Sequence, residues 1–373
     1  MNPLKALQQY GQSVWLDFIR RNLITSGELR RLIDEDGIRG VTSNPSIFEK
    51  AIDGSTDYVD ALAALTRQKG PEPMALYESL AIKDIQDAAD IMKTVYEATR
   101  RRDGYVSLEV SPHLADDTQR SIEEARRLWK AVSRPNVLIK VPATPAGIPA
   151  IRQLISEGIN INITLLFAQS AYEQVAQAYI AGLAERARTG GDVSQIASVA
   201  SFFVSRIDSL IDSIIDGRLK ASPNPGDRGL LESIRGKIAI ANAKLVYQRY
   251  GEICRSEQWR ALEARGAHTQ RLLWASTSTK NPNYRDVMYV EELIGPDTVN
   301  TIPLATLDAF REHGQVRPTL EADLGAADRA MRTLAQVGIS MKDVTERLVR
   351  DGVKLFADAF DKLLDAVDKR RNA

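Results

Sequence analysis

One lysine stands inside a run of residues that otherwise has the composition of a buried strand. Lys140 lies in Val137–Pro142, whose sequence is VLIKVP. Lysine is almost never fully buried unless it has a partner or a chemical task. Removing an ammonium group from water disfavours its charged form, and a neutral amine attacks carbonyl carbon. The run therefore indicates a lysine that forms a Schiff base. The alternative is a lysine whose head reaches solvent or pairs with a carboxylate.

Two carboxylates interrupt other apolar runs in the same way. Asp17 lies in Ser13–Phe18, and Glu109 lies in Tyr105–Val110. Formation of an imine requires loss of water, and cleavage of the carbon–carbon bond beside an imine requires a base on the departing hydroxyl, so two proton-transfer groups are needed. The alternative is that both acids form buried salt bridges with Lys140 for stability alone, which costs desolvation energy. We therefore expect the three residues to share one site.

Further polar residues recur with a period of two, which places them on one face of each expected strand. These sets are Asn160, Asn162 and Thr164; Ser107, Glu109 and Ser111; Thr42 and Asn44; Ser13, Trp15 and Asp17; and Trp274 and Ser276. The interior of a barrel of parallel strands is normally filled by Val, Ile and Leu, and its active site lies at the carboxyl ends of the strands. Polar residues near several strand ends therefore indicate a site at that face.

The elements that must position these residues form a repeating pattern. Short apolar runs alternate with segments such as Ser121–Val132 and Gln169–Arg188, which have the spacing of amphipathic helices. Eight such units favour an α/β fold, a closed (β/α)8 TIM barrel, over an open doubly wound sheet. The expected strands are Ser13–Phe18, Gly40–Asn44, Tyr105–Val110, Val137–Pro142, Ile161–Phe167, Ser198–Val204, Leu272–Thr277 and Thr298–Pro303.

The chain contains no Gly/Ser/Pro-rich linker, so residues 1–373 are expected to form a single barrel domain. The connections Pro45–Gly104 and Arg206–Arg271 are long enough for more than one helix each. Ser340–Lys369 is predicted to be a C-terminal helical extension, because Ser340-x-x-Asp343 resembles a capping box and an apolar stripe follows. We expect this helix to pack on the barrel; a dimerisation helix is the alternative.

Composition excludes several classes of function. The 373 residues include 49 Lys+Arg and 49 Asp+Glu, and this balance argues against binding to nucleic acid or to an anionic membrane. A bound anion is therefore expected to be small. The single cysteine, Cys254, cannot form an internal disulfide. The first ten residues lack the basic and apolar regions of a signal peptide, and no long apolar segment follows, so the expected compartment is the cytoplasm.

Motifs for other chemistries are missing. The three histidines are far apart, with no HxxxH or HExxH spacing, and Cys254 has no CxxC partner, so no His/Cys metal site is predicted. Asp116 and Asp117 could bind a divalent cation, although such a pair more often belongs to a polar loop. The chain has no GxSxG elbow and no GxxxxGK[ST] loop, which argues against a serine hydrolase and a nucleoside triphosphatase.

Five sequence blocks give a more specific indication. With them the chain resembles the transaldolases of the longer bacterial type, from about Asn2 to Leu364. The blocks are Gly40–Phe48 (GVTSNPSIF), Val106–Pro112 (VSLEVSP), Val137–Thr144 (VLIKVPAT), Ile161–Phe167 (INITLLF) and Ser201–Asp208 (SFFVSRID). The resemblance implies the non-oxidative pentose phosphate pathway. There a dihydroxyacetone unit passes reversibly from sedoheptulose 7-phosphate to glyceraldehyde 3-phosphate, giving erythrose 4-phosphate and fructose 6-phosphate.

The resemblance also implies a role for each site residue. Lys140 would form the imine, Glu109 would move protons through a water held with Thr164, and Asp17 would take the proton of the donor's C4 hydroxyl. No metal or organic cofactor would be required, because the protonated imine is the electron sink. Family members include monomers and homodimers. The residues implied to bind substrate are Thr42, Asn44, Asn162, Ser201 and Phe203 for the dihydroxyacetone unit, and Arg206, Ser276 and Lys280 for phosphate.

The chain departs from the family pattern at the phosphate end. Where the best-known members have an arginine two residues after the serine, this chain has Ser278, and the next cation is Lys280. Lys280 would replace that arginine as a point charge. Two alternative functions stay open. One is a fructose-6-phosphate aldolase that releases free dihydroxyacetone, although those relatives are shorter and use a tyrosine near the proton-relay site, whereas the strand here carries Glu109. The other is a sugar-phosphate-binding protein that has lost its activity.

Overall fold

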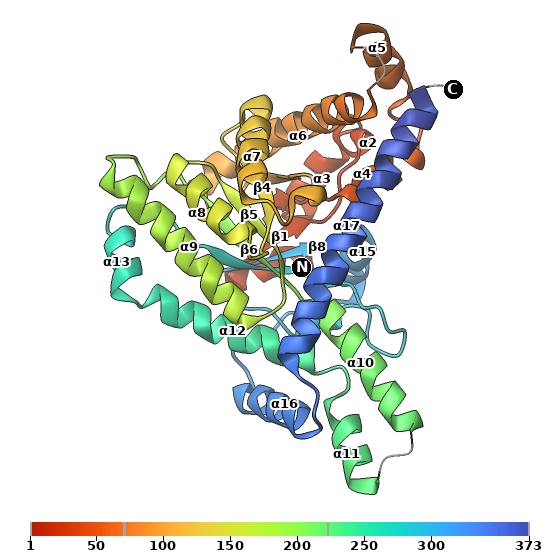
Figure 1. Cartoon of the computed structure of the whole chain (residues 1–373), viewed down its shortest axis with the longest axis vertical. Coiled ribbons are helices and arrows are strands. Elements are labelled where there is room, and N and C mark those ends of the chain that lie inside the picture. The colour runs from red at the N-terminus through yellow and green to blue at the C-terminus, as the bar shows by residue number, and fades with distance from the viewer. Residues whose placement is uncertain (1, 70–71, 222–223, 372–373) are drawn as a thin grey trace.

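The computed structural model describes residues 2–69, 72–221 and 224–371, and its centre is a closed barrel of eight parallel strands in sequence order. Figure 1 shows the strands inside a layer of helices. The (β/α)8 prediction is thus confirmed. The strands are β1 (Gln12–Leu16), β2 (Gly40–Val41), β3 (Tyr105–Glu109), β4 (Val137–Pro142), β5 (Ile161–Leu166), β6 (Ser198–Phe203), β7 (Arg271–Ala275) and β8 (Thr298–Ile302).

Each of the eight predicted runs overlaps a strand, and the end of β2 departs most from its predicted position. Only Gly40 and Val41 pair in the barrel, because Asn44 already caps the helix that follows. Gly40 is required where β2 passes β1, since a Cβ atom there would lie 2.4 Å from the ring of Trp15. A glycine therefore allows the two strands to approach around that indole.

Helices follow every strand, and the two long connections hold several each, as predicted. Apart from two 3₁₀ turns, η1 (Leu7–Tyr10) and η2 (Pro112–Leu114), the described helices are α1 (Pro3–Ala6), α2 (Arg21–Thr25), α3 (Glu28–Asp36), α4 (Pro45–Asp53), α5 (Val59–Lys69), α6 (Pro73–Ala98), α7 (Thr118–Val132), α8 (Gly147–Glu157), α9 (Gln169–Arg188), α10 (Ser205–Lys220), α11 (Pro225–Ile234), α12 (Ile238–Cys254), α13 (Glu257–Glu263), α14 (Met288–Glu291), α15 (Leu304–His313), α16 (Leu324–Gln336) and α17 (Met341–Arg371).

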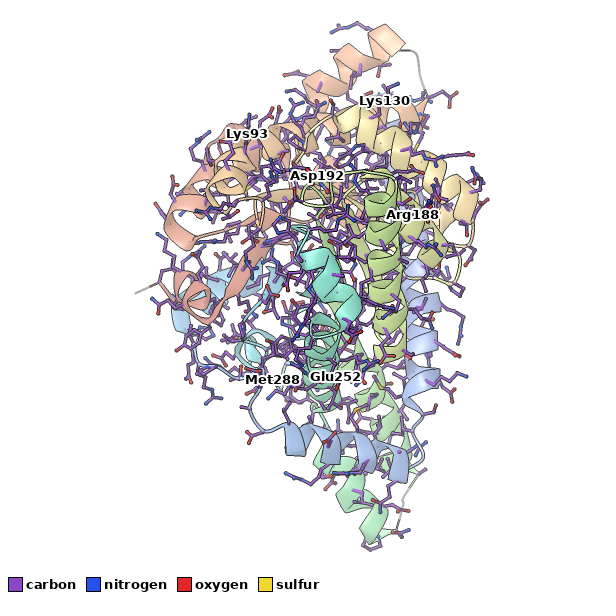
Figure 2. All side chains as sticks on the ribbon, turned by 90° about the vertical axis from the view of Figure 1, so that its left-hand side faces the viewer. Lys93, Lys130, Arg188, Asp192, Glu252 and Met288 are labelled. Carbon is purple, nitrogen blue, oxygen red and sulfur yellow. The ribbon has the colours of Figure 1, made fainter. Side chains whose placement is uncertain are left out.

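The outer surface of the helical layer is polar. Figure 2 labels Lys93, Lys130, Arg188 and Glu252 on α6, α7, α9 and α12, and all four side chains are exposed. The inward faces of these helices cover apolar residues of the strands, such as the fully buried Ile163 of β5. Among the described residues, no helix is long and apolar enough to cross a bilayer.

The C-terminal helix α17 packs on the barrel assembly, as predicted. The hydroxyl of Ser340 accepts a hydrogen bond from the backbone N–H of Asp343 at 3.2 Å, so the predicted cap is present. The helix then contacts α10, β5, α4, α5 and α6. Figure 1 shows it running along one side of the molecule, from the region of α10 to that of α5. This path carries the middle of α17 past the carboxyl ends of the strands.

A buried ion pair closes the opposite end of the barrel. Arg271 of β7 lies 2.8 Å from Asp103, and both side chains are almost fully buried. Asp103 also accepts hydrogen bonds from Ser13 Oγ and Trp15 Nε1. Burial alone would raise the pKa of Asp103, but the guanidinium and these donors lower it. Ser13 and Trp15 therefore lie at the amino-terminal end of the barrel. Asp17, which was predicted to share their face, lies at the end where the strands have their carboxyl ends.

Candidate active site

Lys140 lies inside the barrel with its amine between two neighbouring strands. β3 and β4 pair so that Glu109 lies beside Lys140. The Lys140 Nζ lies 3.2 Å from Glu109 Oε2 and donates a hydrogen bond of 2.9 Å to the carbonyl oxygen of Ser43. The side chain is 7% exposed. The backbone after β2 therefore fixes the direction of the amine, a contact that sequence reasoning missed because it involves a carbonyl group.

Two buried oxygens near this amine have no hydrogen-bond partner among the described residues. They are Glu109 Oε2, whose contact is the ion pair with Lys140, and Thr164 Oγ1 of β5. Burial raises the pKa of the Glu109 carboxyl, while the neighbouring Lys140 opposes this shift. A buried polar atom without a partner is costly. These two oxygens are therefore suited to contact a ligand or a water molecule.

Asp17 follows β1 and is oriented by a hydroxyl group. Thr42 Oγ1 donates a hydrogen bond of 2.6 Å to Asp17 Oδ1 and lies 2.7 Å from Thr301 Oγ1. Burial raises the pKa of the Asp17 carboxyl, and the bond from Thr42 counteracts part of this effect. Since a hydroxyl has one proton, Thr42 directs its proton to Asp17. Thr42 was predicted to contact substrate, and this stays a prediction: its hydroxyl holds the Asp17 carboxylate, and the residue also lines the cavity at the carboxyl ends of the strands.

A cavity of about 400 Å³ opens at the carboxyl ends of the strands and brings most of the predicted residues together. Of the twelve, Glu109 and Asn162 do not line it. The ten that do are Asp17, Thr42, Asn44, Lys140, Thr164, Ser201, Phe203, Arg206, Ser276 and Lys280. The convergence of residues from six strand ends follows from the barrel, because parallel strands in register end at the same face.

Asn162 lies beneath the cavity, and both ends of its amide are engaged. Its Nδ2 donates to Ser107 Oγ at 3.0 Å, and its Oδ1 accepts from Ser201 Oγ at 2.6 Å. Asn162 was predicted to contact substrate; the structure shows that it orients Ser201, which lines the cavity. Asn44 retains free capacity: its Oδ1 accepts one hydrogen bond, from Ile47 N–H at 3.0 Å, and its Nδ2 makes none in the described chain, so the Nδ2 can donate to a ligand.

Three cations surround the mouth of the cavity, and none has a carboxylate within 4.0 Å in the described chain. They are Arg206 at the start of α10, Lys280 after β7 and Lys50 of α4. Burial lowers the pKa of Arg206; burial also lowers that of Lys280, as do the charges of Arg206 and Lys50. The charge of Asp17 opposes the shift of Lys280, but it forms no ion pair with these cations in the described chain, and such a cluster of cations is typical of an anion site.

Lys50 and Ser278 complete this end of the cavity. Sequence reasoning missed Lys50, although Ser46, Ile47 and Lys50 are spaced along one face of α4 directly after Asn44, and all line the cavity. Ser278, which replaces the arginine of the family pattern, accepts a hydrogen bond of 2.6 Å from Lys280 Nζ. Lys280 is thus close to the position where the family pattern has its cation.

The prediction that Trp274 faces inward together with Ser276 is wrong. Trp274 pairs with Phe202, and the two rings meet edge to face at 6.3 Å on the outer side of the barrel. Ser276 has a positive φ of 56°, which breaks the alternation of the strand. As a result Ala275 and Ser276 both line the cavity, and Trp274 does not. A period of two holds only while the backbone stays extended.

Apolar residues form the remaining wall. Phe203 of β6 packs on Phe167 at 5.3 Å between ring centroids, and the Arg206 guanidinium lies 5.8 Å from the Phe203 ring. Leu355 and Phe356 of α17 also line the cavity. Leu355 is 47% exposed although it is a large apolar residue. No local pattern places α17 at the site, because its residues are far along the chain from the strands that they face.

Comparisons with known proteins agree with this geometry. Residues 14–367 match the model of the family described as Transaldolase/Fructose-6-phosphate aldolase. A transaldolase of Trichodesmium erythraeum is 49% identical over 372 residues, which cover 99% of this chain and 97% of that protein. A protein named transaldolase 2 from Nostoc sp. is 48% identical over 371 residues, covering the same shares. A transaldolase of Thiobacillus denitrificans is 46% identical over 364 residues, with 98% and 99% covered.

A match of this extent, with a buried lysine and two carboxylates at the carboxyl end of a closed (β/α)8 barrel, shows that the chain belongs to the transaldolase/fructose-6-phosphate aldolase family.

Proposed function

We propose that the protein is a transaldolase that transfers a dihydroxyacetone unit between sugar phosphates through a Schiff base on Lys140. The donor is sedoheptulose 7-phosphate and the acceptor glyceraldehyde 3-phosphate, and the reverse reaction starts from fructose 6-phosphate. The observation that carries this proposal is the buried Lys140 amine, held between Glu109 and the Ser43 carbonyl group and facing a cavity with cations at its mouth.

In the first step, the neutral Lys140 amine adds to the C2 carbonyl carbon of the donor. The resulting carbinolamine loses water, and Glu109 supplies the proton to the leaving hydroxyl. The buried Thr164 Oγ1, which has no hydrogen-bond partner in the described chain, and Glu109 Oε2, whose contact is the ion pair with Lys140, support a relay through one water molecule. A carboxyl whose pKa is raised by burial is suited to donate and retrieve this proton.

In the second step, Asp17 takes the proton of the C4 hydroxyl as the C3–C4 bond breaks. The bonding electrons move into the protonated imine, which becomes an enamine, and the aldose phosphate departs. An acceptor aldehyde then reacts with the enamine carbon, and Asp17 returns the proton to the new hydroxyl. Thr42 keeps Asp17 oriented throughout, since its hydroxyl donates to the carboxylate. Hydrolysis of the imine, with Glu109 as the base, releases the product.

The polar groups of the cavity divide between the two ends of the substrate. Asn44 Nδ2 and Ser201 Oγ would contact the hydroxyls of the dihydroxyacetone unit, with Asn162 holding Ser201 and Phe203 forming the wall. At the mouth, Arg206, Ser276, Lys280 and Lys50 would bind the phosphate. An arginine can bind phosphate with two parallel hydrogen bonds, and the lysines add point charges that steer it toward the site.

Transfer rather than aldol cleavage follows from protection of the enamine. Leu355 and Phe356 of α17 add apolar surface to the cavity wall. Apolar cover limits the access of bulk water to the carbon that must wait for an acceptor. We propose that this reaction takes place in the cytoplasm, consistent with the single cysteine.

Borohydride trapping tests the proposal. The protein is incubated with fructose 6-phosphate, reduced and digested, and the modified residue is identified by mass spectrometry. We expect a three-carbon adduct on Lys140 that disappears when erythrose 4-phosphate is added before reduction. An adduct that decays at the same rate without an acceptor, with release of dihydroxyacetone, would instead identify an aldolase. Binding of fructose 6-phosphate by folded protein without any adduct would leave only a sugar-phosphate-binding barrel.

A further inference from the structure

Two buried aspartates follow Arg206 on α10 at intervals that place them one helical turn apart. Asp208 is 1% exposed and Asp212 is 6% exposed. The proposed reaction uses neither of them, and neither lines the cavity. Buried carboxylates are costly unless all their oxygens are bonded, so their partners indicate why they are present.

Each aspartate bridges α10 to two other segments. Asp208 accepts hydrogen bonds from Tyr289 Oη at 3.0 Å and from the backbone N–H of Ala239 at 2.8 Å. Asp212 accepts from Tyr284 Oη at 2.6 Å and from the backbone N–H of Gly236 at 3.1 Å. Both tyrosines lie in the segment between β7 and β8, and the two amides lie at the start of α12. The helix that carries Arg206 therefore also holds the segment that carries Lys280.

The contact of Tyr284 is closely fitted. Gly236 has a φ of +64°, and a Cβ atom there would lie 2.6 Å from a carbon of the Tyr284 ring. Only glycine combines that conformation with this close approach. The ring of Tyr284 thus lies on the backbone of Gly236 while its hydroxyl reaches Asp212, and the same Asp212 binds the Gly236 amide.

A short turn links Tyr284 to the residues beside Lys280, which lines the cavity. The Tyr284 N–H donates to the carbonyl oxygen of Asn281 at 3.1 Å. Thr279, which stands between Ser278 and Lys280, donates from its hydroxyl to the carbonyl oxygen of Arg285 at 3.0 Å. The residues on either side of Lys280 are therefore bonded to the residues around Tyr284. Lys280 itself has no carboxylate partner within 4.0 Å in the described chain, so this turn determines where its charge lies.

We propose that Tyr284 is a positioning residue for the substrate phosphate: its hydrogen bond to Asp212 over Gly236 holds Ser278 and Lys280 at a fixed distance from Arg206. This inference rests on the proposed function, because it assumes that the cations at the mouth bind phosphate. Tyr284 acts only on the phosphate end, since Lys140 and its proton-transfer partners are carried by other strands. Loss of the Tyr284 hydroxyl should weaken phosphate binding and leave the chemistry on the carbon chain unchanged.

The test compares a phosphorylated with an unphosphorylated donor, fructose 6-phosphate and fructose, in the rate of borohydride-trapped adduct on Lys140. For Tyr284→Phe we expect the half-saturating concentration of fructose 6-phosphate to rise roughly tenfold, the effect of one lost hydrogen bond. The maximal rate and the second-order rate with fructose should stay within twofold of the wild type. Gly236→Ala, which pushes the ring away, should give the same pattern.

Tyr289→Phe is the matched control. It removes the other tyrosine–aspartate bond to α10, but Tyr289 lies in α14, farther along the chain from Lys280. It should lower the free energy of unfolding in urea without changing the preference for fructose 6-phosphate. An equal loss with both donors in Tyr284→Phe, or an unchanged half-saturating concentration, would overturn the inference.

Arg206→Met separates this inference from the proposed function. If Arg206→Met abolishes the preference for fructose 6-phosphate and Tyr284→Phe leaves it intact, only the role of Tyr284 is refuted. If the wild type already shows no preference, or Arg206→Met does not reduce it, the phosphate site of the proposed function is refuted, and the role of Tyr284 with it.

Discussion

Asp17→Asn should divide the reaction at the bond-breaking step. The substitution replaces one carboxylate oxygen by an NH₂ group of similar size, so the cavity keeps its shape and Thr42 can still donate to the remaining oxygen. The amide cannot accept the proton of the C4 hydroxyl. Glu109, which lies 3.2 Å from the Lys140 amine, is unchanged. We therefore expect imine formation to proceed and C3–C4 cleavage to stall.

The size of the effect follows from the loss of one general base. Such a group typically contributes about 10²- to 10⁴-fold to a rate, which corresponds to roughly 3 to 5 kcal/mol of activation free energy. Imine formation should stay within a few-fold of the wild type, because Asp17 interacts with Lys140 through charge alone and not through a hydrogen bond. Cleavage should then be slower than imine formation, and the intermediate before cleavage should accumulate.

Borohydride trapping with fructose 6-phosphate distinguishes the intermediates by mass. Asp17→Asn should yield a six-carbon phosphorylated adduct on Lys140, whereas the wild type yields the three-carbon adduct. Glu109→Gln is the matched control, because it removes the other carboxylate and should slow the formation of every adduct. A three-carbon adduct formed by Asp17→Asn at the wild-type rate would refute the assignment of Asp17 as the base.

Three further outcomes are expected. Lys50→Met should raise the KM for fructose 6-phosphate about 10-fold or more, the effect of losing one charged contact, with little change in kcat; Lys83→Met, on the outer face of α6, should change neither value in the same steady-state assay. Asp103→Ala leaves the buried guanidinium of Arg271 without its partner and should cost about 3 to 5 kcal/mol in urea unfolding; a loss below 1 kcal/mol would contradict the buried ion pair. Burial raises the pKa of Asp208 to about 7, so between about pH 4 and 7 the folded protein holds a proton that the unfolded chain has released, and stability falls as pH rises through this window by roughly 4 kcal/mol from this group. Asp208→Asn should reduce the dependence of the free energy of unfolding on pH across this window. An unaltered dependence would contradict the raised pKa of Asp208.

The sequence by itself determined the barrel and the chemical core of the site. Eight apolar runs separated by helical segments predict parallel strands, and the confirmed strands lie within or next to those runs. Lys140, Glu109 and Asp17 were predictable because burial of a charge inside an apolar strand costs free energy, so such a residue is expected to have a partner or a chemical role. Alternation along β5 placed Thr164 at the cavity for the same local reason, since an extended backbone sends every second side chain to one face.

Only the tertiary structure decided how these groups are supported. Lys140 donates to the Ser43 carbonyl group, and Thr42 donates to Asp17. Each contact joins residues in or directly after different strands, and no local pattern predicts it. Trp274 faces outward because it pairs with Phe202, and the left-handed backbone at Ser276 ends the alternation and brings Ser276 to the cavity; a period of two cannot predict where an extended strand ends. The cover from Leu355 depends on a helix nearly two hundred residues beyond β5 in the chain. Local patterns show where burial of a charged or polar side chain would cost free energy. The partners of that side chain come from segments distant in sequence, and only the closed barrel brings those segments together.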